Sequence, residues 1–242
     1  MMTTSALVQY GISDCSTSVN YEAPGGYIST LTKTKNDFIP NYHHTYSRKV
    51  FLGGLPPDID EDGIKEAFWK FGTFEVYWPG KHHNPKCLFP PKGYAFLQFE
   101  IEAFVHRLVQ GCIQVSDGGL FYMVSSPSVN NKVIQVKPWR LEDAVTITNE
   151  SFFSRNQFAV FVGGVPRTLT SAGLARHASN AFGNVSYTEI YLDHTMGYPK
   201  GSGVVCFSNF NSFVSAISRN YLEVVIGGFV KHVELKPYYN RW

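Results

Sequence analysis

Residues 92–99, with the sequence KGYAFLQF, alternate in the way that is typical of a half-buried β-strand. Leu97 and Phe99 would share the face that packs into a core, which places Tyr94 and Phe96 together on the other face. Two flat rings on an open strand face can stack on unpaired nucleobases, and each stacked base contributes roughly 1 to 3 kcal/mol. The stretch therefore predicts a surface that binds flat, unpaired bases.

Three further residues fit this chemistry. Lys92 stands at the edge of the strand, where a phosphate would run, and Gly93 lets a ligand backbone pass closely. Phe51 lies between two core residues in the stretch KVFLGGL at 49–55, so the same parity places its ring on the open face. The sequence thus predicts a platform of three rings with a cation beside it.

The stretches around these rings occur twice in the chain. The matched pairs are KVFLGGLP at 49–56 with AVFVGGVP at 159–166, PPKGYAFLQF at 90–99 with YPKGSGVVCF at 198–207, and IQVKPW at 134–139 with VELKPY at 233–238. Three landmarks in the same order indicate two copies of one module. We therefore expect a disordered N-terminal arm at 1–47, a first module at 48–139, a linker at 140–157 and a second module at 158–242.

Within each copy, strand and helix periodicities alternate in the order βαββαβ. This order is typical of four antiparallel strands with both helices on one face. In the first copy, Ile64 and Phe68 recur at helical spacing, and a second helix at 101–110 would bury Ile101. An Asp-Gly-Gly turn within 112–126 predicts an added hairpin in the first copy only. The expected fold is α+β, with two such sandwiches in tandem.

Composition excludes several classes of function. The 242 residues are 44% hydrophobic with a net charge of +2, so an anionic partner must be held by local charge. Cys15, Cys87, Cys112 and Cys206 are scattered, which favours reduced intracellular thiols over a zinc site. The sequence has no 18-residue apolar run and no nucleophile beside a base, so we expect no membrane span, no enzyme, no metal and no cofactor.

The second copy keeps only part of the platform. Phe161 and Lys200 are retained, but Ser202 and Val204 occupy the positions of the two rings on the later strand. Two of three rings are absent. We expect this copy either to contact one or two nucleotides or to act structurally by fixing the geometry of the pair.

Three more aromatic residues lie outside the three-ring platform. Trp139 follows a Lys-Pro pair at the end of a last strand, and base contact and simple packing both remain open for it. Trp78 shares parity with Val76, which favours core packing, and Tyr77 would then face the open side.

These motifs carry a resemblance to known proteins. Residues 92–99 match the octamer of the RNA-recognition motif, with Leu97 for the usual Val, and VFLGGL matches the companion hexamer. Over residues 48–239, the stretches RKVFLGGLPPDIDEDGIKEAF, SSPSVNNKVIQVKPW, FVGGVPR and YPKGSGVVCFSN resemble the tandem motifs of cytoplasmic polyadenylation element-binding proteins. The resemblance implies a main RNA surface and a partial second site. The main surface comprises Phe51, Lys92, Tyr94 and Phe96, with Lys137 and Trp139 leading into the linker, and the second comprises Phe161, Lys200 and Lys236.

The resemblance also implies a function. Members of this family bind single-stranded, U-rich elements in mRNA 3′ untranslated regions and control polyadenylation and translation, often in germ cells or early embryos. It implies polyadenylation or translational-repressor proteins as further partners, and we expect a monomer in the cytoplasm that also passes through the nucleus. In this family, a Cys/His zinc module normally follows the second motif. Two rival functions remain open: a protein-interaction module that uses the same open face, and single-stranded DNA binding.

Overall fold

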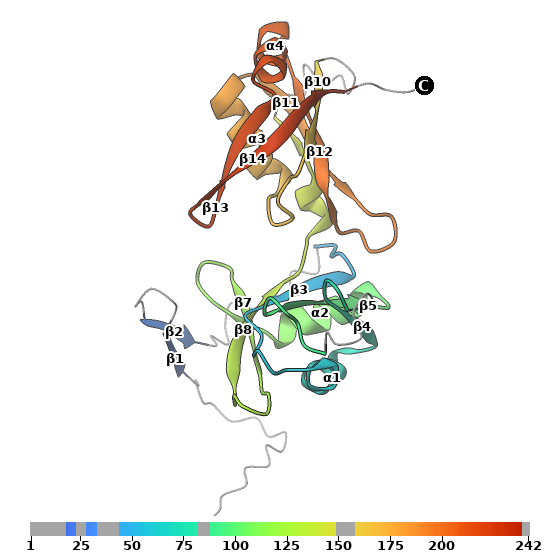
Figure 1. Ribbon diagram of the computed structural model, residues 1–242, viewed down its shortest axis with the longest axis vertical. Helices are drawn as coiled ribbons and strands as arrows, with labels where there is room; N and C mark the ends of the chain where they lie inside the picture. The colour runs from blue at the N-terminus through green and yellow to red at the C-terminus, as the bar shows by residue number, and fades with distance from the viewer. Residues whose placement is uncertain (1–17, 23–27, 33–43, 82–87, 149–157, 239–242) are drawn as a thin grey trace, which may run out of the picture.

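Two α+β domains follow one another along the chain in this computed structural model. The structure describes residues 18–22, 28–32, 44–81, 88–148 and 158–238. Figure 1 shows the two domains one above the other, joined by the connection that follows β8. Each domain has one antiparallel sheet with two α-helices packed on one face. The predicted α+β fold of tandem βαββαβ modules is confirmed.

The first domain has a sheet with the strand order β4-β5-β3-β8-β7-β6. Its elements are β3 (Lys49–Gly53), α1 (Glu61–Phe68), η1 (Trp69–Phe71), β4 (Phe74–Tyr77), β5 (Tyr94–Phe99), α2 (Glu102–Gly111), β6 (Ile113–Gln114), β7 (Leu120–Val124) and β8 (Lys132–Lys137). Strands β6 and β7 pair with each other, as the Asp-Gly-Gly turn predicted.

Helix α1 shows how the sequence sets these elements. Asp60 caps its N-terminus by accepting a hydrogen bond from the Gly63 N–H at 2.8 Å. Ile64 and Phe68 are fully buried in the first core, as their spacing predicts. The prediction that Ile101 points inward is wrong, because Ile101 is the cap before α2 rather than part of its buried stripe, and it is 47% exposed.

The second domain has the strand order β13-β14-β10-β12-β11-β9. Its elements are β9 (Val145–Ile147), β10 (Ala159–Gly163), α3 (Ser171–Phe182), β11 (Val185–Leu192), β12 (Pro199–Phe207), α4 (Phe210–Arg219), β13 (Tyr221–Ile226) and β14 (Phe229–Pro237). The added hairpin was expected in the first domain only. The second also gains one, since β13 pairs along its length with β14.

The connection between the domains is more structured than a plain linker at 140–157. A short 3-10 helix, η2 (Leu141–Ala144), leads into β9, which pairs with β11 through Ile147 opposite Tyr187. The alternation Val-Thr-Ile supplies β-branched residues that suit an edge strand. The connection therefore belongs partly to the second sheet, while residues 149–157 lie outside the described part of the chain.

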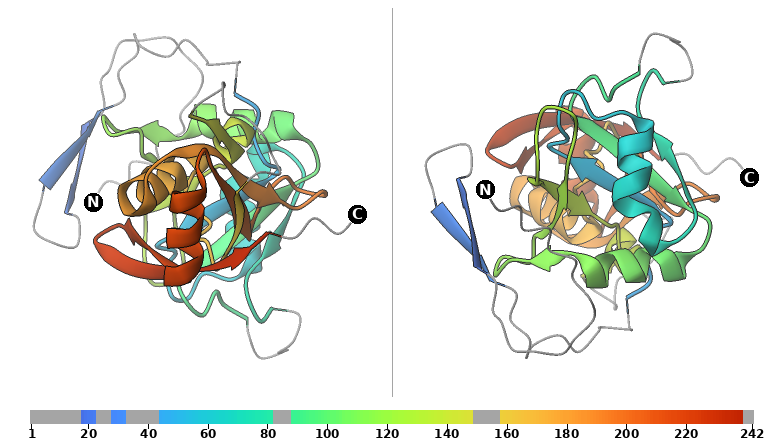
Figure 2. Two further views of the ribbon diagram at one scale, coloured as in Figure 1. Left: turned by 90° about the horizontal axis from the view of Figure 1, so that it is seen from above. Right: turned by 90° about the horizontal axis from the view of Figure 1, so that it is seen from below.

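The structure describes parts of the N-terminal arm at 1–47, and the disorder expected of this arm stays a prediction. Strands β1 (Ser18–Glu22) and β2 (Ile28–Thr32) pair as an antiparallel hairpin that forms a sheet of its own, with β2 beside β6 of the first domain (Figure 2). Closer to the first domain, Ser47 is buried, and its N–H donates to the Trp139 carbonyl at 2.8 Å. The first domain thus begins before residue 48, and the rest of the arm lies outside the described residues.

Candidate nucleic-acid interface

Three rings lie together on the face of the first sheet that the helices leave uncovered. Strands β3 and β5 place Phe51 opposite Phe96 and Gly53 opposite Tyr94. The Phe51 and Tyr94 ring centroids are 5.6 Å apart with their planes inclined by 29°, and the Phe51 and Phe96 centroids are 5.6 Å apart in an edge-on contact. A Cβ on Gly53 would lie 2.7 Å from Phe51 Cε1, so glycine lets this ring lie along the strand. We call Phe51, Tyr94 and Phe96 the ring platform.

The third ring of this platform is covered. Phe96 lies on the open face, as its parity predicts, but it is only 7% exposed. Tyr198 of the second domain makes an edge-on contact with it at 5.8 Å between centroids, and Trp139 packs in the same cluster. Phe51 and Tyr94 remain half-buried. Two rings of the platform are therefore open to a ligand in this arrangement, and the RNA-binding role of Phe96 remains a prediction.

A lysine is held among the same rings. Lys49 Nζ lies 4.6 Å from the centroid of Phe96, 5.1 Å from that of Tyr77 and 5.6 Å from that of Tyr198. Burial lowers the pKa of Lys49, and the nearby positive charge of Arg167 lowers it further. We call Lys49, Phe96, Trp139 and Tyr198 the domain joint, because they bring both domains into contact.

A tight turn of the second domain presents Tyr198 to the first. The Asp193 carboxylate accepts hydrogen bonds from the backbone N–H groups of Met196 at 2.6 Å and Tyr198 at 3.0 Å. The Met196 carbonyl in turn accepts from the Ser47 hydroxyl at 2.9 Å and the Arg48 N–H at 3.0 Å. The turn is thus fixed internally and bonded to the strand entry of the first domain.

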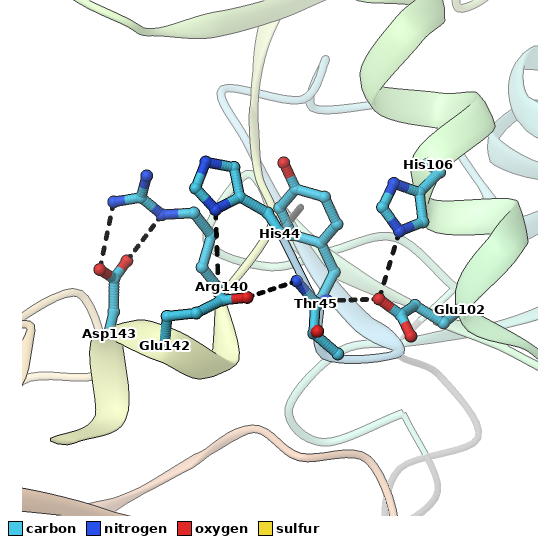
Figure 3. A network of polar contacts seen from close by, with 8 residues as sticks. His44, Thr45, Glu102, His106, Arg140, Glu142 and Asp143 are labelled. Atoms are coloured by element: carbon cyan, nitrogen blue, oxygen red, sulfur yellow. Dashed lines mark hydrogen bonds and ion pairs between the residues drawn. The ribbon is translucent and has the colours of Figure 1, made fainter. Parts of the chain in front are cut away.

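The start of the first domain is tied down by carboxylates from two other segments (Figure 3). The Thr45 N–H donates to Glu142 of η2 at 2.6 Å, and the Tyr46 N–H donates to Glu102 of α2 at 2.7 Å. Glu102 also contacts His106 Nε2 at 3.2 Å. Burial by itself would raise the pKa of Glu142, but the hydrogen bond from Thr45 leaves that pKa lowered. These bonds hold the start of the connection beside the first sheet.

The two residues predicted to lead into the linker have different environments. Lys137 lies opposite Phe51 on β8 and is exposed. Trp139 is 6% exposed, and its indole Nε1 is sealed from solvent without a hydrogen-bond partner in the described part of the chain. Trp139 thus packs within the domain joint, and its contact with a base stays a prediction.

Two clefts open beside the platform. The larger, of about 770 Å³, runs along β8 past Lys137 and the connection. The smaller, of about 460 Å³, has Tyr94 on the first-domain side and Lys200 on the second-domain side. Phe51 and Arg167 line both clefts, so the two hollows meet between the domains. A single strand could pass from one to the other across the open rings.

The second sheet does not offer a comparable surface. Phe161 is half-buried, and Val204 in the position of the third ring is buried beside Tyr187. Lys236 is engaged by Glu234 at 2.8 Å, whereas Lys200 is exposed and faces the smaller cleft. Of the predicted second site, Lys200 therefore lies across the smaller cleft from the first-domain rings, and the binding roles of Phe161 and Lys236 stay predictions.

The remaining predicted residues lie near the platform or in the core. Lys92 is exposed just before β5, and Gly93 there has a left-handed φ of 64°. Tyr77 packs with the open-face cluster, as predicted. Trp78 is buried in the first core, which confirms the packing expected from its parity.

Sequence reasoning missed four residues at this interface. Lys49 shares parity with Phe51, so the strand pattern contained the signal that places it on the open face. Tyr198, Arg167 and Lys231 approach the platform from the second domain. No periodicity in the chain predicts a contact between modules, so these three residues carry no sequence signal of their own.

Other chemistry finds little support among the described residues. They contain no group of three or more His, Cys, Asp or Glu side chains arranged to hold a metal ion. Cys112 and Cys206 are reduced, buried thiols, and burial raises the pKa of the Cys112 thiol to about 12, which suppresses its reactive thiolate. Cys15 and Cys87 lie outside the described ranges. Within those ranges, every helix falls short of the length and apolar character needed to cross a bilayer.

Comparison with known proteins assigns the family. Sequence models described as the RNA recognition motif match residues 47–138 and 160–224, which together are more than half of the chain. Translational regulator orb2 of Drosophila melanogaster is 46% identical over 193 residues, covering 80% of this chain and 27% of the relative. Cytoplasmic polyadenylation element-binding protein 1 of Caenorhabditis briggsae is 38% identical over 206 residues, covering 80% of this chain and 35% of the relative.

One solved structure can be set beside these relatives. The Sex-lethal RNA recognition domains 1 and 2 from Drosophila melanogaster align with 70% of this chain and 91% of their own, at 20% identity and a TM-score of 0.25. The chain spans about a quarter to a third of the length of the two relatives described above. By its two matched motifs and these relatives, the chain belongs to the cytoplasmic polyadenylation element-binding protein family of tandem RNA-recognition-motif proteins.

Proposed function

We propose that this chain binds single-stranded, U-rich RNA in mRNA 3′ untranslated regions and thereby controls polyadenylation and translation. The observation that carries the proposal is the pair of stacked rings, Phe51 and Tyr94, left open on the first sheet beside two clefts. A flat ring accepts any unpaired base, and nearby backbone and side-chain groups can read base edges. The names of the relatives, a translational regulator and polyadenylation element-binding proteins, support the regulatory part.

The rest of the functional picture follows from this proposal. The chain acts as a binding module rather than an enzyme, as a monomer, in the cytoplasm with passage through the nucleus. It recruits polyadenylation or translational-repressor proteins to the mRNA that it holds. None of these roles requires a metal or a cofactor at the ring platform.

The test is a binding titration of the full chain with a fluorescent U-rich RNA. Replacing Tyr94 or Phe51 with Ala should each cost about 1 to 3 kcal/mol, because a stacked base loses its ring. Two matched ring removals serve as controls. Trp69, 72% exposed beyond α1, and Phe161 of the second sheet should each change the affinity far less when replaced by Ala.

Two rivals are separated in the same titration. RNA bound through phosphates loses affinity with a log-log salt slope of about −0.7 per neutralised charge, whereas a protein ligand held on this face by apolar contacts gives a nearly flat curve. A matched deoxy oligonucleotide that binds equally well would favour single-stranded DNA. Unchanged RNA affinity in folded Tyr94→Ala and Phe51→Ala proteins would overturn the proposed function.

A further inference from the structure

The smaller cleft is built from both domains, and its two walls differ in character. The first domain supplies the half-buried rings of Phe51 and Tyr94 and the edge of the mostly covered Phe96. The second domain supplies the loop between β10 and α3, the start of β12 and one residue of β14. The apolar wall is where bases would stack. The opposite wall therefore faces the backbone of any strand held there.

The second-domain wall is cationic. Arg167, Lys200 and Lys231 all line the cleft, and all three are exposed. None of the residues that line this cleft is acidic. Among the described residues, none of these three cations forms an ion pair with a carboxylate. Three positive charges with no carboxylate among them form a site for a polyanion.

Arg167 has a second like charge nearby. Burial lowers the pKa of Lys49 in the domain joint, and the positive charge of Arg167 lowers it further. The same charge opposes the rise that burial causes in the pKa of Tyr198. Among the described residues, the acidic group that offsets the charge on Lys49 is Asp193, whose carboxylate already accepts three backbone hydrogen bonds in its turn. The charges of Arg167 and Lys49 are thus close enough to repel each other. An anion between the domains would relieve this repulsion.

The backbone that carries Arg167 is fixed. The Val165 N–H donates to the Gly201 carbonyl at 2.8 Å, which ties the loop to β12 beside Lys200. Val165 and Leu169, on either side of Arg167, are both buried in the second core. Because the loop is anchored on both sides, the backbone of Arg167 has a fixed position, and its side chain lies where the two clefts meet.

We propose that Arg167, Lys200 and Lys231 bind the phosphates of nucleotides whose bases stack on Phe51 and Tyr94. The second domain thereby holds the phosphate backbone of the RNA, and it does not stack bases on rings of its own sheet. The inference rests on the proposed RNA-binding function and extends it to residues of the second domain. It also gives Lys200 a binding role, although Ser202 and Val204 stand where the first domain has Tyr94 and Phe96.

The experiment measures the salt dependence of U-rich RNA binding by the full chain. Arg167→Ala and Lys231→Ala should each weaken binding by about fivefold, the upper end for an exposed charge contact, and the double variant by more. The log-log salt slope should fall by about 0.7 for each cation removed. Arg176→Ala on α3 and Lys70→Ala after α1 remove the same charges from exposed positions outside the cleft, and both should retain the wild-type slope.

A modified RNA locates the contact. Replacing single phosphates with neutral methylphosphonates should weaken wild-type binding at one or two positions. At the position held by Arg167, the Arg167→Ala protein should show no further loss, because the two changes remove the same contact. If every position costs both proteins equally, the assignment of Arg167 to a phosphate is wrong.

The outcomes separate this inference from the function on which it rests. If Tyr94→Ala weakens RNA binding while Arg167→Ala and Lys231→Ala keep the wild-type slope, the cationic wall is wrong and the proposed function stands. If the wild-type chain binds no RNA, both fail. If a polyglutamate peptide binds in an Arg167-dependent manner and RNA does not, the cleft belongs to an acidic protein partner and the inference is overturned.

Discussion

The two domains share one fold but treat the open face of their sheets in opposite ways. On the first sheet, Phe51 and Tyr94 stay open beside a cleft. On the second sheet, Tyr187, Val204 and Cys206 form a small buried cluster on the corresponding face, and Tyr238 packs against it. The fold supplies a face without helices in both cases. Whether that face can bind a ligand is decided by a few side chains and by what the chain lays over them.

The difference extends to how each domain serves the other. Phe96 of the first domain packs in the domain joint, where Tyr198 of the second domain covers it. The second domain also places Arg167 and Lys200 across the smaller cleft from Phe51 and Tyr94. The first domain therefore presents rings to the cleft and the second presents positive charge, which is the arrangement that the proposed function requires.

The sharpest way to test the comparison is to remove one tyrosine from each open face. Tyr187 is 2% exposed, so Tyr187→Ala should destabilise the second domain by about 3 to 5 kcal/mol, as is usual when a large buried side chain is truncated. Tyr94→Ala should change the stability of the first domain by less than about 1 kcal/mol, because its ring is not part of the core. Urea unfolding, followed by a signal from each domain, measures both values.

A matched variant distinguishes the ring from the hydroxyl. The Tyr187 hydroxyl donates to Glu189 at 2.6 Å, and Tyr187→Phe removes this bond while keeping the ring. We expect it to cost about 1 kcal/mol. If Tyr187→Ala is no more harmful than Tyr94→Ala, the second face is not the covered surface described above.

The sequence predicted the fold well, because periodicity and the repeated landmarks report on local structure. Alternation placed Phe51, Tyr94, Phe96 and Tyr77 on one face, and that arrangement is confirmed. Exposure was not predictable in the same way. Phe96 is covered by Tyr198 from a turn about a hundred residues later in the chain, and no local pattern encodes a contact between modules.

The edges of the domains were the other weak point. Strand β9 lies in the stretch expected to be a linker, and β13 is an added strand that the landmarks did not include. Both contain β-branched residues, and their pairing depends on an edge already present in the folded sheet. The sequence can show that such a run suits a strand, but only the tertiary fold provides its partner.

A glycine marks a second difference between the domains, with a smaller expected effect. Ala95 of β5 and Gly203 of β12 occupy the same place in the repeated octamer. A Cβ on Gly203 would lie 2.2 Å from the backbone oxygen of Glu189 on β11. Gly203→Ala should therefore cost the second domain about 3 kcal/mol, the upper end of the usual range for overpacking, because a backbone atom must move.

The reciprocal change in the first domain is milder. Ala95→Gly creates no clash, and it should cost about 1 to 2 kcal/mol, through the added freedom of the unfolded chain and the loss of one buried methyl group. Thermal unfolding of the two variants gives both values in one series. A Gly203→Ala protein as stable as the wild type would mean that β11 and β12 can separate at this point without penalty.

The domain joint offers the finest test of the comparison, through its response to alkaline pH. Burial raises the pKa of the Tyr198 hydroxyl to about 12, although the positive charge of Arg167 opposes this effect. Because the folded-state pKa lies above the unfolded value of about 10, the unfolded chain loses this proton first as the pH rises. The stabilisation is thus fully present below about pH 10 and is lost between about pH 10 and 12.

Tyr198→Phe keeps the ring against Phe96 and removes the titrating group. The variant should lose less stability than the wild type between about pH 10 and 12, by on the order of 1 to 2 kcal/mol, in urea unfolding series at fixed ionic strength. The other groups that titrate in this range, Cys112 among them, are the same in both proteins and cancel in the difference. Arg167→Ala removes the opposing charge and should deepen the alkaline loss. Identical pH profiles for the wild type and Tyr198→Phe would mean that Tyr198 is hydrated in solution, and that Phe96 is as open as the other two rings of the platform.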